Sequence, residues 1–368
     1  MALATSSIGV EEEFFVVDAE TGRLRPDGRE VIDGAHHFED DQLDVELSRS
    51  QVESGTAVCR DLDELHLSLT SLRRRLRVAA DDVGCRIMAS GTHPFAHWSE
   101  DGGVSAKDEY RYLESMYGQL TDEQVVCGCH IHVGVDDPEL AIQIMNRARV
   151  YLPLFVALGA NSPFWLGDDT RYASYRTQIF HRWPTSGIPE EFSSRAEYDE
   201  LVALMHHTKT IDQPARIYWD LRPSVRYPTL EFRACDVQVS VEHSVALAGL
   251  ALALVETCGD ASRREESTDP MRPELLRAAL WRASRFGLDE TLLDVVDRRS
   301  SPADEVIRSF LGLLRPALEA RDHWDRVSQT VDELLGGGGG ARQQRAAYRR
   351  RGEIGDVVDV VVDHAITA

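Results

Sequence analysis

Three consecutive glutamates interrupt an apolar segment near the start of the chain, in the sequence VEEEFFVV at residues 10–17. The flanking residues are typical of a buried strand, and a strand cannot bury three carboxylates without partners. Alternate side chains of a strand point to the same face, so Glu11 and Glu13 share one face and Glu12 takes the other. The segment therefore predicts either an edge strand with solvated glutamates or a sheet whose acidic face surrounds positive charge.

Two carboxylates on one face of a strand repel each other unless a cation lies between them. Alternate residues of an extended strand are roughly 7 Å apart, and at an effective dielectric constant of about 20 the repulsion is on the order of 2 kcal/mol. Bound cations would make this repulsion tolerable. For this segment alone, glutamates that protect an edge strand remain the alternative.

A second strand-like segment, CGCHIHVGVDD at residues 127–137, carries two histidines. Alternation places His130 and His132 on one face and Ile131 and Val133 on the other. Neutral imidazole is a common metal ligand, and the neighbouring glycines leave room near the backbone. One satisfied and one exposed histidine is the structural alternative. A zinc site that uses the cysteines of this segment is disfavoured, because alternation sends their sulfur atoms to the opposite side.

Two further segments combine acids with arginines. In PTLEFRACD at 228–236, Glu231, Arg233 and Cys235 are expected to share one strand face. In IYWDLRPS at 217–224, Asp220 and Arg222 follow the same alternation. Either pair could be a simple ion pair. Arginine near these carboxylates also suits a phosphate ligand, because guanidinium matches phosphate oxygens in a fork.

Together these segments predict a polar cleft that holds divalent cations and a nucleotide. A less regular segment, ELSRSQVESGTAVC at 46–59, adds Glu46 and Glu53. Carboxylates with an imidazole describe a hard divalent ion such as Mg²⁺ or Mn²⁺. The sequence has no P-loop, no kinase-like glycine loop and no dinucleotide-binding fingerprint. A nucleotide would therefore be held by metal and arginine.

Strand-like and helix-like segments are mixed without a regular βαβ alternation, which favours an α+β fold. Apolar residues three and four positions apart predict a helix over 61–83, with Asp61 and Glu64 as a capping box. Asp137 followed by Pro138 predicts the start of another helix. The longest apolar stretch, VALAGLALALV at 245–255, is shorter than the roughly 20 residues of a membrane span and predicts a core helix.

The last part of the chain is expected to be helical. Residues 303–335 fit a helix interrupted at Pro316, and the five glycines at 336–340 suggest a flexible joint before two short helices. The segment after these glycines is too short to form a separate domain. We expect a single domain over residues 1–368 with a helical C-terminal appendage from about 303.

Charge and cysteine content restrict the partners and the compartment. The formal net charge of −22 argues against nucleic acid or an anionic membrane as main partner, because both favour a basic surface. Six cysteines in 368 residues do not form a small disulfide scaffold, and the first residues do not resemble a secretion signal. We expect a cytoplasmic, thiol-reduced protein.

Several motifs in a fixed order resemble the glutamate-cysteine ligase type 2 family, the carboxylate-amine ligases related to glutamine synthetase. The resemblance covers essentially the whole chain. The matching segments are GVEEEF (9–14), SQVESGTAVC (50–59), GTHPF (91–95), CHIHVG (129–134), DDTRYASYR (168–176), WDLRPS (219–224), LEFRACD (230–236), WRASRFGLD (281–289) and GGARQQRAAYRR (339–350).

This resemblance implies a glutamine synthetase-like α+β fold, in which helices back a curved, mainly antiparallel sheet that forms the active-site cleft. It implies ATP and Mg²⁺ or Mn²⁺ as cofactors and an amide bond made through an acyl phosphate. The implied metal ligands are Glu11, Glu13, Glu53, His130 and Glu231. His132 would lie near the nucleotide phosphates with Arg176 and Arg233. Arg233 would stabilise the transferring phosphoryl group, and Arg222 is a further candidate for catalysis.

Two other functions remain open at this point. A metal-dependent hydrolase could use the paired histidines, although the other histidines share no strand pattern. A non-catalytic relative could bind nucleotide or amino acid, although every implied ligand keeps its chemistry. The resemblance also makes a homo-oligomer plausible, whereas the identities of the small-molecule carboxylate and amine are not readable from the sequence.

Overall fold

The computed structural model describes residues 7–35, 42–100, 102–268 and 270–366, with backbone only from 363 onward. Seven strands form one sheet in the order β2-β3-β1-β5-β9-β8, with β4 also paired to β1, and every pair is antiparallel. The strands are β1 (Ile8–Asp18), β2 (Leu43–Val45), β3 (Gln51–Gly55), β4 (Cys85–Met88), β5 (Gly128–Gly134), β8 (Leu221–Pro223) and β9 (Thr229–Asp236). The expected α+β class with a mainly antiparallel sheet is confirmed.

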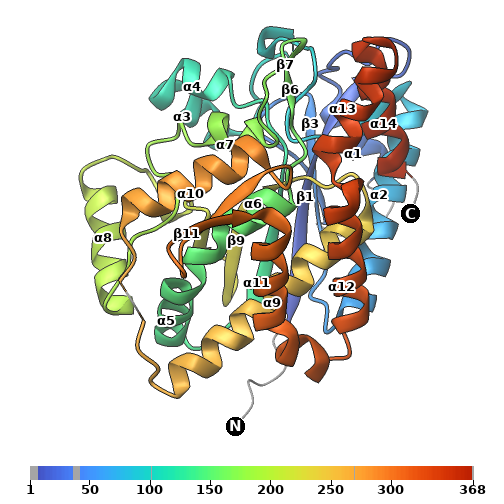
Figure 1. Cartoon of the computed structure of the whole chain (residues 1–368). Helices are drawn as coiled ribbons and strands as arrows, with labels where there is room; N and C mark the ends of the chain where they lie inside the picture. Colours follow the sequence, from blue (N-terminus) through green and yellow to red (C-terminus); the bar gives the residue numbers. More distant parts are fainter. Residues whose placement is uncertain (1–6, 36–41, 101, 269, 367–368) are drawn as a thin grey trace.

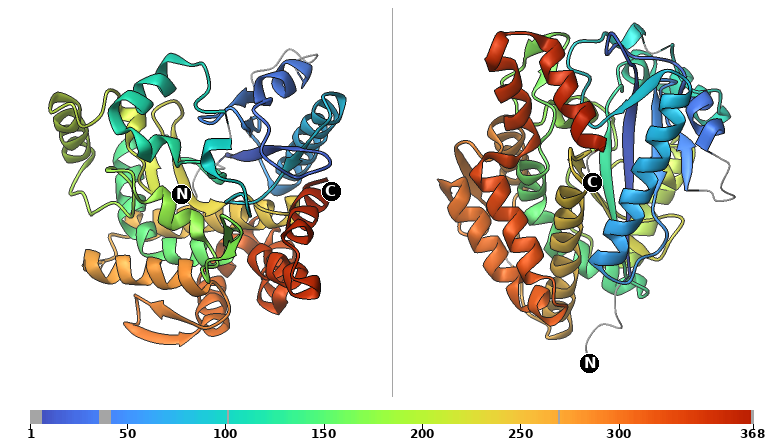
Figure 2. Two further views of the ribbon diagram at one scale, coloured as in Figure 1. Left: turned by 90° about the horizontal axis from the view of Figure 1, so that it is seen from above. Right: turned by 90° about the vertical axis from the view of Figure 1, so that its right-hand side faces the viewer.

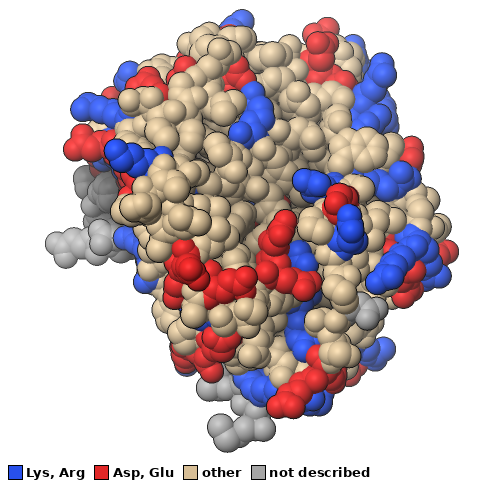
Figure 3. Space-filling view, turned by 90° about the vertical axis from the view of Figure 1, so that its left-hand side faces the viewer, with Lys and Arg blue, Asp and Glu red and all other residues tan. Residues whose placement is uncertain are grey.

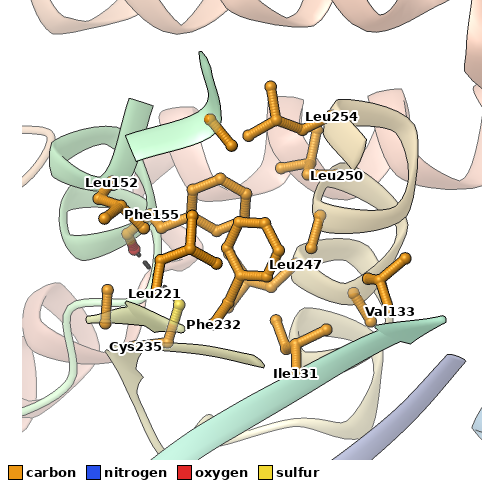
Figure 4. Packing of buried hydrophobic residues seen from close by; sticks show 14 of the residues in the cluster. Ile131, Val133, Leu152, Phe155, Leu221, Phe232, Cys235, Leu247, Leu250 and Leu254 are labelled. Atoms are coloured by element: carbon orange, nitrogen blue, oxygen red, sulfur yellow. Dashed lines mark hydrogen bonds between the residues drawn. The ribbon is translucent and has the colours of Figure 1, made fainter. Parts of the chain in front are cut away.

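Six helices cover one side of this sheet (Figures 1 and 2). These helices are α2 (Leu62–Asp82), α5 (Pro138–Ala148), α6 (Leu152–Leu158), α9 (Val241–Arg263), α11 (Ala303–Ala320) and α12 (Trp324–Glu333). Apolar side chains of β5 and β9, such as Ile131 and Phe232, pack against Leu247 and Leu250 of α9 and Phe155 of α6 (Figure 4). The apolar faces of β5 and β9 are therefore buried under helices, and their polar faces are left for the site.

The remaining elements surround this core. They are α1 (Gly28–Ala35), α3 (Asp108–Tyr117), α4 (Gln119–Asp122), α7 (Tyr175–Phe180), α8 (Arg195–His207), α10 (Pro273–Phe286), α13 (Gly340–Arg351), α14 (Ile354–Ile366), and the hairpins β6 (Phe164–Trp165)–β7 (Asp168–Asp169) and β10 (Thr291–Asp294)–β11 (Arg299–Pro302). Short turns of helix cover Trp98–Glu100, Arg149–Tyr151, Pro214–Arg216 and Leu334–Gly338. The face on the α8 side gathers acidic groups in its central and lower part (Figure 3), in keeping with the net charge of −22.

The predicted starts of two helices, at Asp61 and at Asp137, are confirmed. Asp61 accepts hydrogen bonds from the backbone of Asp63 and Glu64 at the start of α2, and Asp137 caps α5 with Pro138 in its first turn. Glu64 bonds the backbone N–H of Arg60 at 2.9 Å, one residue before the capping residue, so the capping box is shifted. The apolar stretch at 245–255 belongs to α9, which is 23 residues long. By length and composition α9 could cross a membrane, but 78% of its most apolar window is buried inside the protein.

The interruption expected at Pro316 is wrong. Helix α11 continues through Pro316 to Ala320, and the chain bends instead at residues 321–323 before α12 begins. Pro316 removes a hydrogen bond to the carbonyl of Gly312, but both residues lie on the exposed side of the helix. Water can hydrate that carbonyl, so the helix persists.

The glycine run is packed into the molecule instead of linking separate parts. A Cβ on Gly340 would meet the side-chain oxygen of Asn161 at 2.2 Å, and Gly337 takes a positive φ of 111°. Only glycine allows this approach and this turn without strain. Side chains of α11 and α12, such as Leu314 and Val327, belong to the same apolar core as β5 and β9. The division into one domain with an appendage stays a prediction.

Candidate functional site

Nine residues expected to bind metal, bind nucleotide or act in catalysis line one cavity of about 260 Å³ on the polar face of the sheet. They come from five strands and one helix that are far apart in sequence. They are Glu11, Glu13, Glu53, His130, His132, Arg176, Arg222, Glu231 and Arg233.

Strand register explains why these side chains converge. Glu13 is paired with Glu53 across β1 and β3, and Glu11 with His130 across β1 and β5. Farther along, His132 is paired with Glu231 and Glu231 with Arg222. Directly opposite residues of antiparallel strands have Cβ atoms about 5 Å apart on one face. A continuous polar row therefore crosses the sheet.

The centre of this row is a group of carboxylates and imidazoles. Oε2 of Glu11 lies 3.5 Å from Nδ1 of His130 and 3.5 Å from Nε2 of His132. Nε2 of His130 lies 3.6 Å from Oε1 of Glu13, whose other oxygen accepts a 2.5 Å hydrogen bond from the backbone of Gly128. The two histidines thus sit between glutamates, at distances longer than a good hydrogen bond.

Among the described residues, three sets of side chains could each hold a cation. In each set one ligand atom per residue lies within 4.8 Å of the others: Glu11, Glu53 and His130; Glu11, His132 and Glu231; and Glu13, Glu46 and Glu53. Nε2 of His130 and of His132 is buried and has no hydrogen-bond partner among the described residues. Buried polar atoms are normally satisfied, so these nitrogens and the clustered carboxylates fit a divalent ion.

The carboxylates of this site differ in pKa for identifiable reasons. Burial and the charges of Glu11, Glu46 and Glu13 hold the pKa of Glu53 well above its usual value. Burial and Glu13 raise the pKa of Glu46 to about 7. Burial also acts to raise the pKa of Glu11, but the neighbouring imidazoles of His130 and His132 outweigh it and lower that pKa. Negative charge therefore accumulates around Glu53, where a cation would relieve it.

Arginines neutralise the far end of the polar row. Glu231 accepts hydrogen bonds of 2.8 and 3.1 Å from Arg222 and also contacts Nη1 of Arg233. Burial alone would raise the pKa of Glu231, but Arg233 and Arg222 lower it far below its usual value. Arg176 lies 4.0 Å from Asp236 and stacks 5.1 Å from the ring centre of Phe180.

The prediction that Cys235 shares a face with Glu231 and Arg233 is wrong. The register between β5 and β9 shifts between Cys129 and Ile131, which adds one residue to β9 at this point. A β-bulge of this kind turns the following side chains to the opposite face. Cys235 consequently packs in the core beside Phe232 (Figure 4). Asp236 accepts hydrogen bonds from the hydroxyl groups of Ser162 and Ser174 and lies 4.0 Å from Arg176.

Several lining residues were not predicted. Tyr110 donates a 3.2 Å hydrogen bond to Glu46. Glu46 was expected in the polar cleft, but it had no assigned role there. Aromatic residues Phe180, Trp183 and Tyr218 form another wall. They belong to short helices and loops, so no strand alternation marks them in the sequence.

Solved structures share this fold. A glutamate-cysteine ligase from Francisella tularensis in complex with AMP matches with a TM-score of 0.73 at 12% identity, over 99% of this chain and 89% of the other. The Pup ligase PafA in complex with Pup matches with a TM-score of 0.59 at 13% identity, over 98% and 72%. The expected fold, a mainly antiparallel sheet backed by helices, is confirmed by these structures.

The family follows from sequence. The model of glutamate-cysteine ligase family 2 matches residues 7–360. A putative glutamate-cysteine ligase 2-2 from Frankia alni is 42% identical over 98% of this chain and 97% of its own length. One from Rhodopirellula baltica is 35% identical over 100% and 98%. The chain also spans 41% of a longer relative from Frankia casuarinae, at 38% identity. The chain belongs to glutamate-cysteine ligase family 2.

Proposed function

We propose that this chain uses ATP to join a substrate carboxylate to an amine, through an acyl phosphate. The main support is that carboxylates, imidazoles and arginines from distant segments line a single cavity. The clustered acids, among them Glu53 with its raised pKa, suit divalent cations, and the arginines beside them suit phosphate.

We propose that Glu11, Glu13, Glu53, His130 and Glu231 hold Mg²⁺ or Mn²⁺. We add Glu46 to this set, because a carboxylate oxygen of Glu46 lies within 4.8 Å of carboxylate oxygens of Glu13 and Glu53. Bound divalent ions would neutralise the charge that spreads over the phosphate oxygens during transfer. His132 would sit beside the phosphates, held by a 2.9 Å hydrogen bond between its Nδ1 and Thr229.

The arginines are proposed to have different roles. Nε, Nη1 and Nη2 of Arg222 all donate to protein acceptors. We therefore propose that Arg222 holds Glu231 in position and does not contact the substrate directly. Nε of Arg233 is buried without a partner among the described residues, so Arg233 has a donor available for the transferring phosphoryl group. Arg176 remains a proposed phosphate ligand at the cavity wall.

The proposed reaction needs no protein nucleophile. A carboxylate oxygen of the substrate attacks the γ-phosphorus of ATP, and ADP leaves. The amine nitrogen then attacks the acyl carbon, the phosphate leaves, and the nitrogen loses a proton to give the amide. Cys127 and Cys129 are buried, and burial raises the pKa of both thiols, so neither is suited to act as a nucleophile.

Glutamate and cysteine are the first substrates to test, because the relatives carry the name glutamate-cysteine ligase. A cytoplasmic location and a homo-oligomer remain predictions.

The test is a screen of carboxylate and amine pairs with MgATP, followed by ADP formation and mass spectrometry of the products. We expect stoichiometric ADP, phosphate and amide for at least one pair. A hydrolase would not need ATP, and a binding protein would release no ADP. Either result would overturn the proposal.

A further inference from the structure

The hairpin tip between β8 and β9, residues 224–227, forms part of the cavity rim. Ser224, Val225, Arg226 and Tyr227 all line the cavity. Val225 is 55% exposed and Tyr227 is 51% exposed, so two large apolar side chains face solvent beside a strongly charged site. Exposed apolar groups at the rim of a cavity are suited to contact a ligand.

Hydrogen bonds hold this tip in a defined shape. Oγ of Ser224 accepts from the backbone N–H groups of Arg226 at 3.3 Å and Tyr227 at 3.4 Å. The backbone N–H of Ser224 donates to the carbonyl of Thr229 at 2.9 Å. The Tyr227 ring stands edge-on to His132, with ring centres 6.1 Å apart. Tyr227 thus places the tip next to His132, in the centre of the polar row, and Arg226 is the preceding residue of this tip.

Arg226 differs from the other arginines that line the cavity. Arg222 and Arg233 are paired with Glu231, Arg216 with Asp212, and Arg176 lies 4.0 Å from Asp236. Within the described parts of the chain, the guanidinium of Arg226 forms no ion pair and no hydrogen bond.

The lack of a partner is notable because acids are abundant. The chain has 62 acidic and 40 basic residues, and several glutamates line this same cavity. An unpaired arginine at the rim of an acidic cavity attracts incoming anions and keeps all its donors available for them.

We propose that Arg226 binds the phosphates of ATP. Arg226 would be a nucleotide contact that is not among the residues predicted from the sequence, and this assignment rests on the proposed function. Tyr227 touches His132, and His132 forms one possible cation site with Glu11 and Glu231. Phosphate oxygens that bind cations there would lie next to the hairpin tip. A triphosphate also carries more negative charge than a single substrate carboxylate, so it gains more from a free guanidinium.

The experiment measures equilibrium binding of MgATP and of adenosine, without the other substrates, to the wild-type chain, Arg226→Ala and Arg226→Lys. Arg299→Ala is the matched control, because it removes one arginine from another exposed hairpin outside the cavity. We expect Arg226→Ala to weaken MgATP binding roughly tenfold or more, as loss of a charge-assisted hydrogen bond implies. Arg226→Lys should be weakened less, and adenosine binding should not change.

Unchanged MgATP binding by Arg226→Ala, an equal loss in Arg299→Ala, or an equal loss for adenosine would overturn the assignment. In the ligase assay, a raised KM for the carboxylate substrate with an unchanged KM for ATP would overturn it as well. Because the binding measurement does not require turnover, it tests Arg226 even if the wild-type chain forms no amide. Failure of the proposed function is therefore distinguishable from failure of this assignment.

Discussion

Glu12 and Arg73 form a bidentate ion pair inside the molecule, on the side of the sheet away from the cavity. Nε and Nη2 of Arg73 donate to the two oxygens of Glu12 at 2.8 and 2.6 Å. Both residues are almost fully buried, at 0% exposure for Glu12 and 2% for Arg73. Ser244 also donates to Glu12 at 2.5 Å, which joins β1, α2 and α9. The middle glutamate of the triplet is thus structural, whereas its neighbours face the cavity.

Replacing Arg73 with Met should strongly destabilise the fold. The change leaves the Glu12 carboxylate buried without its cation, and breaking a buried pair in this way costs about 3–5 kcal/mol. Urea unfolding of the metal-free protein measures this free energy. Arg60→Ala is the control, because Arg60 pairs with Glu64 at the surface, where solvent screens the pair, and its loss should change stability little. A loss below that of the control would contradict the structural role of the buried pair.

Much of the site could be predicted from the sequence because strand alternation is a local property. Glu11, Glu13 and His130 lie on the expected face because β1 and β5 pair in regular register there. Cys235 does not, because a bulge depends on how β9 pairs with a strand distant in sequence. The partners of Glu12 could not be predicted either, since Arg73 and Ser244 meet it only through tertiary packing. Alternation along a strand thus predicts which face of the sheet a side chain takes, but not which residues of other elements contact it.

Glu53→Gln should separate metal binding from folding. Burial and neighbouring carboxylates raise the pKa of Glu53, so removing its charge should relieve repulsion and make the metal-free protein slightly more stable. The same change should reduce the rise in Tm that Mg²⁺ or Mn²⁺ produces in the wild-type chain, because a ligand is lost. Thermal unfolding with and without each ion measures both effects. Equal shifts in Tm for variant and wild type would remove Glu53 from the proposed metal ligands.

Arg233→Lys should slow ATP turnover by roughly 100-fold or more, with a small effect on stability. Lysine keeps the charge near Glu231 but loses the planar fork and the buried Nε donor that is proposed to face the phosphoryl group. The rate of ADP formation at saturating substrates is the measurement. Arg182→Lys serves as control, because Arg182 pairs with Glu123 and does not line the cavity. A rate close to that of wild type would remove Arg233 from the transition state.

The stability of the fold should fall as the pH drops from about 6.5 toward about 4, in part because of His93. His93 is fully buried, its Nε2 lies 2.9 Å from the carbonyl of Gly22, and its Nδ1 accepts from the backbone N–H of Ala96 at 2.9 Å. These bonds require a neutral ring that carries its proton on Nε2. Burial lowers the pKa of His93 to about 4, against an ordinary value of 6.5.

The sign follows from proton binding. Between pH 4 and 6.5 the unfolded chain binds a proton at this histidine and the folded chain does not, so acid favours unfolding by up to about 3 kcal/mol. His93→Asn keeps an acceptor for the N–H of Ala96 but cannot be protonated. We therefore expect the variant to be less stable than wild type at pH 7.5, with a smaller further loss at pH 4.5. Urea unfolding at both pH values measures the difference, and an unchanged pH dependence in the variant would show that other groups cause the acid sensitivity.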